Sequence, residues 1–360
     1  MVNQSLTALG NRCHRSVQNA ARCWFDRGVT ALASILTNAS ALTALQSLSA
    51  TNKSLEMTQA RISTGYRVAE ASDNAAYWSI ATTMRSDKSS LSVVKDALGL
   101  GAGKVDTAYS VTNDTVKIVN LIKDKLVAAV GASAADKAKI QVEITAFQLQ
   151  LKTAADGAVF SGANWLSVDT TTGQTTPGTH DDAQIVSAFT RNAAGKIALQ
   201  TIDINVQSVK LYDAFGTATN VEKGILDGLR LATSGVRDNT ATAAAGGTVA
   251  ATDGYAVSTL TVVGFNDTQI QQMLNVVDAA ARELTDAATN LGAAKTRIDL
   301  QKNATQALMD SIDRGVGQLV DADMNQESTR LQALQVQQQL GIQALSIANS
   351  NSQNILALFK

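Results

Sequence analysis

The stretch that decides the fold is IQQMLNVVDAAARELTDAATNLGAAKTRI, residues 270–298. Its large aliphatic side chains recur every seventh residue, and a neighbouring row of alanines keeps the same interval. The aliphatic positions are Ile270, Val277, Leu284, Leu291 and Ile298, and the alanines are Ala280, Ala287 and Ala294. A seven-residue apolar repeat places these side chains along one side of an α-helix, as in a coiled coil. The stretch therefore predicts a long helix that packs one face against another helix.

The same interval appears near the start of the chain. Between Ser34 and Thr64 no Gly or Pro interrupts the sequence, and an apolar stripe repeats every seven residues. The stripe consists of Ala41, Leu48, Leu55 and Ile62, with Leu45 on the same side. Ser34 or Thr37 can cap this helix at its start, and Gly65 is expected to end it.

The last segment of the chain is also predicted to be helical, with a polar face rich in Gln and Asn. Its apolar positions include Met324, Leu331, Leu334, Leu345, Ala348, Ile355, Leu356, Leu358 and Phe359. A helix with one apolar face has nothing to bury that face against when it is alone. The simplest arrangement therefore pairs the two ends of the chain with each other.

Three further helical stretches are expected between the ends, at about 74–98, 116–130 and 134–155. Asp73 can cap the first of them. Glycines at 99, 101 and 103 predict a joint between the first two stretches, and Gly131 predicts a break before the third.

Residues 156–264 have a different character, with many Gly and Thr and the only proline of the chain. Alternating apolar residues predict strands at 197–206 and 258–263. Thr-rich stretches at 169–179 and 238–253 are expected to be loops.

The predicted fold class is mainly α with a β-containing insert, in an elongated molecule with antiparallel paired terminal coiled-coil helices and a helical bundle next to them. The predicted divisions are a terminal domain of 34–75 and 318–360, a helical domain of 76–155 and 265–317, and a variable α+β surface domain of 156–264. Residues 1–33 stand apart, because they contain four arginines against one acidic residue and both cysteines of the chain. They could be a folded element, an Arg-rich organellar presequence, or residues translated upstream of the true start.

Composition excludes several classes of protein. The 30 basic and 31 acidic side chains leave a net charge of −1, which gives no general attraction for nucleic acid or acidic membranes. No apolar stretch reaches the roughly 18 residues of a membrane-spanning helix. Beyond Cys23 the chain has no cysteine, so neither disulfides nor a Cys-based zinc site can hold the main fold.

No motif for catalysis, cofactor binding or metal binding stands out. The Gly-rich stretch before Lys104 lacks the first Gly and the Ser or Thr of a phosphate-binding loop. His14 and His180 are the only histidines, without a second ligand at metal-binding spacing. The acidic pairs Asp181–Asp182 and Asp321–Asp323 are more often loop or helix-surface residues than a catalytic pair. We therefore predict no catalytic, cofactor-binding or metal-binding residues.

The apolar stripes have two interpretations. They could form the internal core of a monomeric helical bundle, or they could be surfaces for other copies of the chain. The stripes run to the ends of the helical segments, and the chain finishes on the apolar sequence ILALF, residues 355–359, which a soluble monomer would normally not expose. These features favour assembly.

At several positions the sequence resembles bacterial flagellin, the subunit of the flagellar filament. SILTN at residues 34–38 and ARISTGYRV at 60–68 are similar to the N-terminal region of that family. ASDNAA at 71–76 resembles the family's Ser-x-Asp-Asp-Ala-Ala turn, with Asn74 in the second acidic place. QVQQQLG at 335–341 and NILALF at 354–359 are similar to the flagellin C-terminus. YWSI at 77–80 resembles flagellins of alphaproteobacteria.

The resemblance implies a non-enzymatic structural subunit of an extracellular filament for swimming. The paired terminal helices would form its inner tube, the next helices its outer tube, and the variable middle its exterior. The implied polymerisation seam consists of Leu45, Leu48, Leu55, Ile62, Leu331, Leu334, Leu345, Ile355, Leu356, Leu358 and Phe359. The implied family-motif contacts are Arg61, Asp73, Asn74, Ala75 and Ala76.

The implied partners are other copies of the chain, other flagellins, an export chaperone, the type III export gate, and the hook-associated junction and cap proteins. Nucleic acid and membrane insertion are not expected. Two features depart from the family pattern. The stretch VKIVNLI at 116–122 lacks the arginines of the segment that the animal flagellin receptor recognises. The family pattern also begins near Leu32, so residues 1–33 are expected to be an upstream-translated or non-native extension.

Rival interpretations remain at this stage. A hook–filament junction protein would have related ends and a lower copy number. A secreted enzyme in the β-containing insert would depend on His180, and a coiled-coil regulator or adhesin would form soluble dimers without filaments.

Overall fold

The computed structural model describes residues 38–171, 178–192, 195–216 and 218–358, with side chains as far as residue 350. The extension predicted at residues 1–33 lies outside these residues, as do Ser34 and Thr37. The described chain divides into two compact units. One consists of the residues up to Trp78 together with those from Val320 onward, and the other is Ser79–Leu319. The predicted fold class, mainly α with a β-containing insert, is confirmed.

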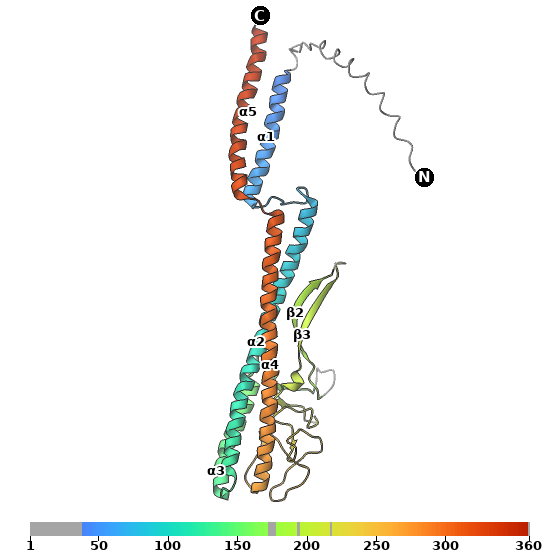
Figure 1. Cartoon of the computed structure of the whole chain (residues 1–360), viewed down its shortest axis with the longest axis vertical. Helices are drawn as coiled ribbons and strands as arrows, with labels where there is room; N and C mark the ends of the chain where they lie inside the picture. The colour runs from blue at the N-terminus through green and yellow to red at the C-terminus, as the bar shows by residue number, and fades with distance from the viewer. Residues whose placement is uncertain (1–37, 172–177, 193–194, 217, 359–360) are drawn as a thin grey trace, which may run out of the picture. The chain divides into compact units, whose positions relative to one another are not determined.

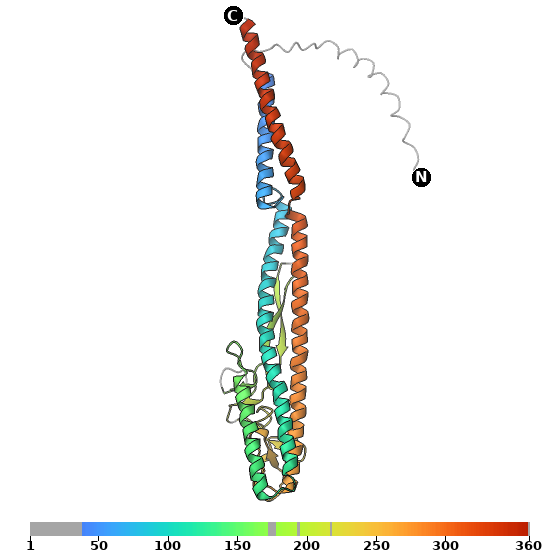
Figure 2. The same cartoon turned by 90° about the vertical axis from the view of Figure 1, so that its left-hand side faces the viewer.

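The first unit contains helices α1 (Ala39–Thr64) and α5 (Met324–Leu358), which lie side by side (Figures 1 and 2). Asn38 caps α1, because its side-chain oxygen accepts a hydrogen bond from the Ala41 amide at 3.0 Å. Gly65 ends the helix in the left-handed conformation with φ of 76°, and its amide donates to the Arg61 carbonyl. The predicted stop at Gly65 is confirmed.

The second unit is built on three helices, α2 (Ala75–Ala129), α3 (Ala134–Gly157) and α4 (Asp267–Val320). Helix α2 begins just before the boundary between the units. Cross-helix polar contacts join α2 and α4, and residue numbers fall along α4 in the same steps as they rise along α2. These contacts are Lys88–Asp313, Lys95–Gln306, Asp106–Lys295 and Lys123–Asp278, at 2.6–2.7 Å. The two helices are therefore antiparallel and keep one register without a skip.

The core of this unit follows the repeat predicted for residues 270–298. All five aliphatic side chains of the repeat are fully buried. From α2 they meet Leu98, Val105, Ile122 and Leu126, which are also fully buried. Figure 2 shows α3 folded back along the second half of α2, where Ile144 and Leu151 complete the core. The helical end of the insert-bearing unit is thus a closed three-helix bundle.

The joint predicted at the glycines of positions 99, 101 and 103 is wrong, because α2 runs through all three without interruption. A Cβ atom on Gly101 would collide with the Ile185 side chain, and one on Gly103 would collide with the Phe160 ring. Two of the glycines therefore make room for neighbouring segments and do not break the helix.

The predicted cap of this helix also needs correction. The Asp73 carboxylate accepts hydrogen bonds from the amides of Ala69 and Glu70 and so closes the preceding turn. The residue that caps α2 is Asn74, whose side-chain oxygen accepts from the Tyr77 amide at 3.1 Å. Asp73 therefore closes the turn before the helix, and the adjacent Asn74 caps the helix itself.

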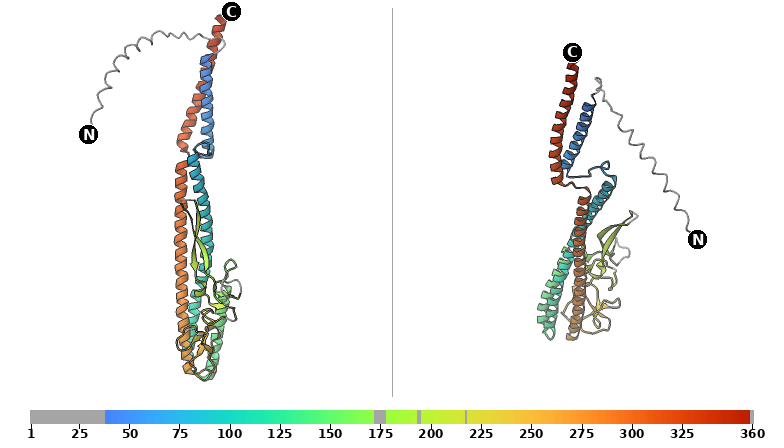
Figure 3. Two further views of the ribbon diagram at one scale, coloured as in Figure 1. Left: turned by 90° about the vertical axis from the view of Figure 1, so that its right-hand side faces the viewer. Right: turned by 45° about the horizontal axis from the view of Figure 1, so that its top comes forward.

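The described residues of the insert form three small sheets. Strands β2 (Ala183–Arg191) and β3 (Ile197–Ile204) form an antiparallel ribbon that runs along the helices, and the rest of the insert gathers near α3 and the start of α4 (Figure 3). Strand β1 (Ser167–Val168) pairs in parallel with β4 (Tyr212–Asp213). The third sheet has the order β5 (Arg230–Leu231), β7 (Asp253–Tyr255) and β6 (Thr242–Ala243). Short 3₁₀ turns lie at Val206–Ser208 and Val257–Thr259.

The strand predicted at 258–263 is wrong. This segment begins in the second 3₁₀ turn and continues as extended chain without a strand partner. Two glutamines of α3 replace the partner: Gln148 donates to the carbonyls of Val257 and Leu260, and Gln141 accepts from the Val262 amide at 2.8 Å. Side chains of a helix thus satisfy backbone groups that a sheet would otherwise pair.

Candidate assembly surfaces

The register of α1 against α5 is fixed by contacts spread along both helices. The Asn38 side chain donates to the Ala348 carbonyl at 2.8 Å, and Gln338 donates to Asn52 at 2.8 Å. Near the other end, the Arg61 guanidinium donates to Glu327 at 3.2 Å. Numbers rise along α1 while they fall along α5, so the pair is antiparallel, as predicted.

Each helix contributes one residue to the pair every three or four positions, which is coiled-coil spacing. On α1 the less exposed positions at this spacing are Ala41, Ala44, Leu48, Thr51, Leu55, Thr58 and Ile62, and on α5 they are Glu327, Leu331, Leu334, Gln338, Gly341, Leu345 and Ala348; Ser54 and Arg61 flank the α1 positions and are also half-buried. We call these fourteen residues the terminal seam. Its most buried members on α1 are Thr51 and Thr58, with 7% and 2% of their surface exposed.

The predicted polymerisation residues fall into three groups. Leu48, Leu55, Ile62, Leu331, Leu334 and Leu345 lie half-buried within the terminal seam. Leu45 lies outside it and is 52% exposed, because residue 45 is one position past the inward-facing Ala44. Ile355, Leu356 and Leu358 belong to α5, beyond the last described side chain, and Phe359 lies outside the described residues.

Sequence reasoning missed the polar and small members of the seam. Thr51, Thr58, Gln338, Gly341 and Glu327 lie three or four residues from the aliphatic positions. This spacing could have identified them from the sequence, but an apolar repeat defined by Leu and Ile alone passes over polar residues and glycine. Glu327 is nearly buried, pairs with Arg61, and leaves its second carboxylate oxygen without a hydrogen-bond partner in the described part of the chain.

The predicted family-motif residues have local structural roles. Arg61 belongs to the ion pair just described, and Asp73 and Asn74 close a turn and cap α2. Ala75 and Ala76 form the exposed first turn of α2. The ties between the two chain segments continue next to this motif, where the Ala322 amide donates to the Gly65 carbonyl at 2.9 Å.

A second apolar stripe lies on α5. Val336, Leu340 and Ile347 are 55%, 58% and 62% exposed. Their spacing of four and seven residues places them on one face of the helix, opposite Leu334 and Leu345 of the terminal seam. Helix α5 is therefore apolar on two opposite sides, and only one of them is covered by α1.

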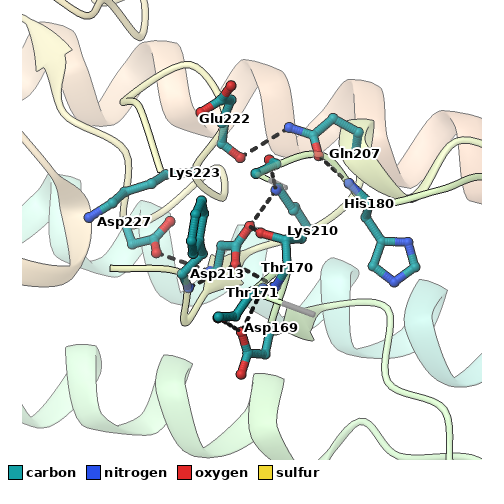
Figure 4. A network of polar contacts seen from close by, with 12 residues as sticks. Asp169, Thr170, Thr171, His180, Gln207, Lys210, Asp213, Glu222, Lys223 and Asp227 are labelled. Carbon is teal, nitrogen blue, oxygen red and sulfur yellow. Dashed lines mark hydrogen bonds and ion pairs between the residues drawn. The ribbon is translucent and has the colours of Figure 1, made fainter. Parts of the chain in front are cut away.

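The insert is held near its base by a buried polar network (Figure 4). The Lys210 ammonium lies 2.6 Å from the Asp213 carboxylate, and both side chains are fully inaccessible to solvent. Asp213 also accepts hydrogen bonds from the Thr170 hydroxyl at 2.7 Å and from the Phe215 amide at 3.0 Å. Asp227 accepts from the Asp213 amide at 3.0 Å. These contacts join three segments of the insert, around Thr170, Lys210–Phe215 and Asp227, where the regular strands are very short.

Burial and hydrogen bonding act in opposite directions on the two acids of this network. Burial tends to raise the pKa of Asp213, but the hydrogen bonds from Lys210, Phe215 and Thr170 outweigh it and lower the pKa overall. Burial raises the pKa of Asp227, and only its hydrogen bonds and Lys223 partly offset this effect. Burial also raises the pKa of Tyr212 next to them. Asp213 is thus held ionised, whereas Asp227 is biased toward its neutral form.

The groups considered for chemistry have structural partners. The His180 amide donates to Gln207 at 3.2 Å, and its ring nitrogen Nδ1 lies 2.6 Å from the Asp181 carbonyl. Asp323 accepts from the amides of Asn325 and Gln326 at the start of α5. Among the described residues, no group of three or more His, Cys, Asp or Glu is arranged to hold a metal ion. Nor does any described helix combine the length and apolarity needed to cross a membrane.

Comparison with known families decides the identity of the chain. The family model for the bacterial flagellin N-terminal helical region matches residues 35–171, and the one for the C-terminal helical region matches residues 274–359. The chain belongs to the flagellin family. The two matches include α1, α2, α3, almost all of α4 and α5, and they leave out most of the insert.

Curated flagellins match over nearly the whole chain. Flagellin C of Rhizobium meliloti strain 1021 is 46% identical over 335 residues, and a flagellin of Brucella melitensis is 47% identical over 329 residues. Flagellin A of Rhizobium meliloti is 42% identical over 408 residues. Each alignment covers 91% of this chain and all of the relative. The predicted alphaproteobacterial type is confirmed, and this flagellin is a structural subunit of the bacterial flagellar filament.

Proposed function

We propose that the α1–α5 pair of each copy forms the inner wall of the filament, that α2, α3 and α4 form the surrounding layer, and that the insert at 156–264 faces outward. The observation that carries this proposal is the second apolar stripe of α5. A stripe of Val336, Leu340 and Ile347 on the side opposite α1 has no use in an isolated chain, and a second copy would cover it.

The terminal pair gains little from its own contacts. Thr51 and Thr58 are its buried residues on α1, so this helix buries no aliphatic side chain completely within the described chain. Covering an exposed aliphatic side chain contributes about 1.5–3 kcal/mol. Covering three such side chains on α5 in a contact between copies would therefore add several kcal/mol to what the seam supplies within one copy.

The assembly is of the open, head-to-tail kind. The covered and uncovered faces of α5 are different surfaces, so a contact between copies uses two unlike patches. Such contacts generate a helical polymer when the rotation between copies does not close a ring. Stiffness would come from the α2–α4 pair, in which ionic contacts reinforce a fully buried aliphatic core.

The partners of this flagellin are proposed on the same grounds. Before assembly the exposed stripe of α5 needs a cover, which suits an export chaperone that delivers the chain to the type III export gate. At the two ends of a filament the same surfaces would meet hook-associated junction and cap proteins. Mixed filaments with other flagellins would use the same seam. The extracellular position of the filament and a non-enzymatic role follow from this assembly.

Substitution of the stripe tests the proposal. Val336, Leu340 and Ile347 are changed together to Ser, and filament formation is followed by light scattering and electron microscopy. We expect a soluble chain with an intact second unit that does not polymerise, as we also expect after deletion of residues 340–360. The matched control changes Val221 and Val236 to Ser, since these insert residues are 49% and 61% exposed. Normal filaments from the α5 variant, or equal loss in the control, would refute the proposed arrangement.

A further inference from the structure

A short loop of the insert, residues 224–228, packs against strand β4 and the residues just before it. The amides of Ile225 and Leu226 donate to the carbonyls of Lys210 and Leu211, both at 3.0 Å. The side chains of Ile225 and Leu226 are fully buried. These backbone bonds exist only while the loop lies in place, so the two amides report whether it is closed.

The carboxylate of Asp227 joins this loop to β4. Its Oδ2 atom accepts a hydrogen bond from the Asp213 amide at 3.0 Å (Figure 4). Its Oδ1 atom is buried and has no hydrogen-bond partner among the residues that the structure describes. A carboxylate oxygen that is buried without a partner is costly when the group is charged and less costly when the group is neutral.

The groups that face Asp227 from β4 offer no free counter-charge. Asp213 is itself ionised and has the Lys210 ammonium as its partner at 2.6 Å. The Tyr212 hydroxyl, which also faces Asp227, is buried and unpartnered in the described part of the chain. An ionised Asp227 would therefore place a second negative charge beside Asp213 at the base of the insert.

Two lysines lie on other sides of this cluster. Lys223, directly before the loop, attracts a charge on Asp227 but only partly offsets the burial that raises the pKa of this acid. On α3, Lys152 lies 4.9 Å from the centroid of the Tyr212 ring and is paired with Asp156 at 2.7 Å. The neutral form of Asp227 is thus the form that suits the closed loop.

We propose that residues 224–228 are a pH-sensitive latch on the base of the insert, held closed while the Asp227 carboxyl is neutral and loosened when it ionises. Opening would break the bonds of Ile225, Leu226 and the Asp213 amide and would bring the carboxylate into water, while the rest of the unit stays folded. The latch is a property of the single chain. Its response to the medium around a filament rests on the proposed outward position of the insert.

The direction of the effect follows from proton linkage. In the opened loop Asp227 has the ordinary aspartate pKa of about 4, and in the closed loop its pKa is raised. The closed loop therefore has its full stability below about pH 4 and loses part of it as the pH rises through the raised pKa. Since a single proton is involved, the equilibrium for closing changes by at most about tenfold per pH unit.

Hydrogen exchange of the unassembled full-length chain between pH 4 and 8 tests the latch. Mass spectrometry follows a peptide that spans residues 223–229, and each rate is divided by the intrinsic rate at that pH. We expect the protection of this peptide to fall with rising pH, by at most about tenfold per unit, and then to level off. A peptide that spans residues 230–236 is the internal reference, because the Ala232 amide donates to the Asp253 carbonyl at 2.8 Å in a separate sheet. Its protection should stay constant.

Two variants separate Asp227 from other acids. Asp227→Asn keeps an oxygen for the Asp213 amide and cannot ionise, so the peptide of residues 223–229 should be equally protected at every pH. The matched control is Asp182→Asn at an exposed position of the insert, which should keep the native pH profile.

Three results would overturn the proposal. The first is a native chain in which the protection of residues 223–229 does not depend on pH. The second is an equal fall in the reference peptide, which would indicate unfolding of the whole unit. The third is an unchanged fall in Asp227→Asn. The first two are measured in the native chain, so they decide the matter even where a variant does not fold.

Discussion

The buried ion pair of the insert allows a quantitative test. Lys210 and Asp213 are three residues apart, and neither side chain has solvent-accessible surface. Lys210→Met keeps most of the side-chain volume and removes the ammonium. Loss of one partner of a buried pair typically costs about 3–5 kcal/mol, because the other charge stays buried. Asp213 would keep its bonds from Thr170 and Phe215, so we expect the lower end, about 3 kcal/mol.

A second pair in the same unit provides the control. Lys117 and Asp114 are also three residues apart, but their side chains are 75% and 61% exposed. Lys117→Met should change the free energy of unfolding by less than about 0.5 kcal/mol. Both variants differ from the native chain by the same chemical change, so the difference between them reports burial alone.

Urea unfolding followed by the fluorescence of Trp165 is the assay. Trp165 is 8% exposed and belongs to the core of this unit, so its emission should shift on unfolding. For a unit of this size, about 3 kcal/mol corresponds to a fall in melting temperature of roughly 6–12 °C. Equal stability of the Lys210→Met and Lys117→Met variants would show that the buried pair does not hold the insert, and the reasoning would be wrong.

Three further predictions concern other parts of the chain. Burial raises the pKa of Asp227 in the folded state, so the stability that its neutral form contributes is fully present below its unfolded pKa and is lost as pH rises through the folded one. Asp227→Asn should therefore gain stability relative to the native chain as the pH rises above about 4, the ordinary pKa of an aspartate, in urea titrations; a difference independent of pH would contradict this. Gly101→Ala should destabilise the second unit, because the added Cβ atom would collide with Ile185. Gly99→Ala has open space around it and should stabilise the same unit by about 0.5–1 kcal/mol. Thermal melts that shift the melting temperature of both variants in the same direction would reject the packing role of Gly101. Amide hydrogen exchange should be faster in α1 and α5 than in α4 before assembly and should slow after it, and equal protection beforehand would argue against a seam completed by neighbours.

The helical framework could be predicted because its signals are local. The seven-residue repeats of the terminal and central helices are visible without knowledge of any partner, and Gly65 marks a stop through its own backbone conformation. The same local signals failed at Gly101, where the absence of a side chain serves Ile185 of a strand far along the sequence. A glycine that breaks a helix and a glycine that accommodates a neighbour are identical in the sequence.

In the insert, by contrast, a local pattern predicted the wrong element because the partners of the segment lie far away in the sequence. Alternating apolar residues at 258–263 predicted a strand, and Val257, Leu260 and Val262 are indeed buried. Burial of alternate residues needs only an extended chain, however, and the backbone partners here are Gln141 and Gln148 of α3. Long-range side-chain to backbone hydrogen bonds leave no periodic signal, which is why this segment could not be assigned correctly from its own residues.

The assembly surfaces could be predicted in part. The aliphatic residues of the terminal seam were identified from their repeat, whereas Thr51, Gln338 and Glu327 were not, because polar residues at seam positions look like ordinary surface residues in a sequence. Their presence has a physical consequence. A seam made only of Leu and Ile at a seven-residue interval would be stable in several registers, and a chain with such ends would associate indiscriminately at high concentration. The polar members leave the pair with little fully buried aliphatic surface within one copy, and their hydrogen bonds match the alignment that the turn between the helices imposes. In the proposed assembly the outer stripe of α5 supplies the stability that is missing inside the copy, so a terminal unit that is weak alone is suited to a subunit whose ends are covered by its neighbours.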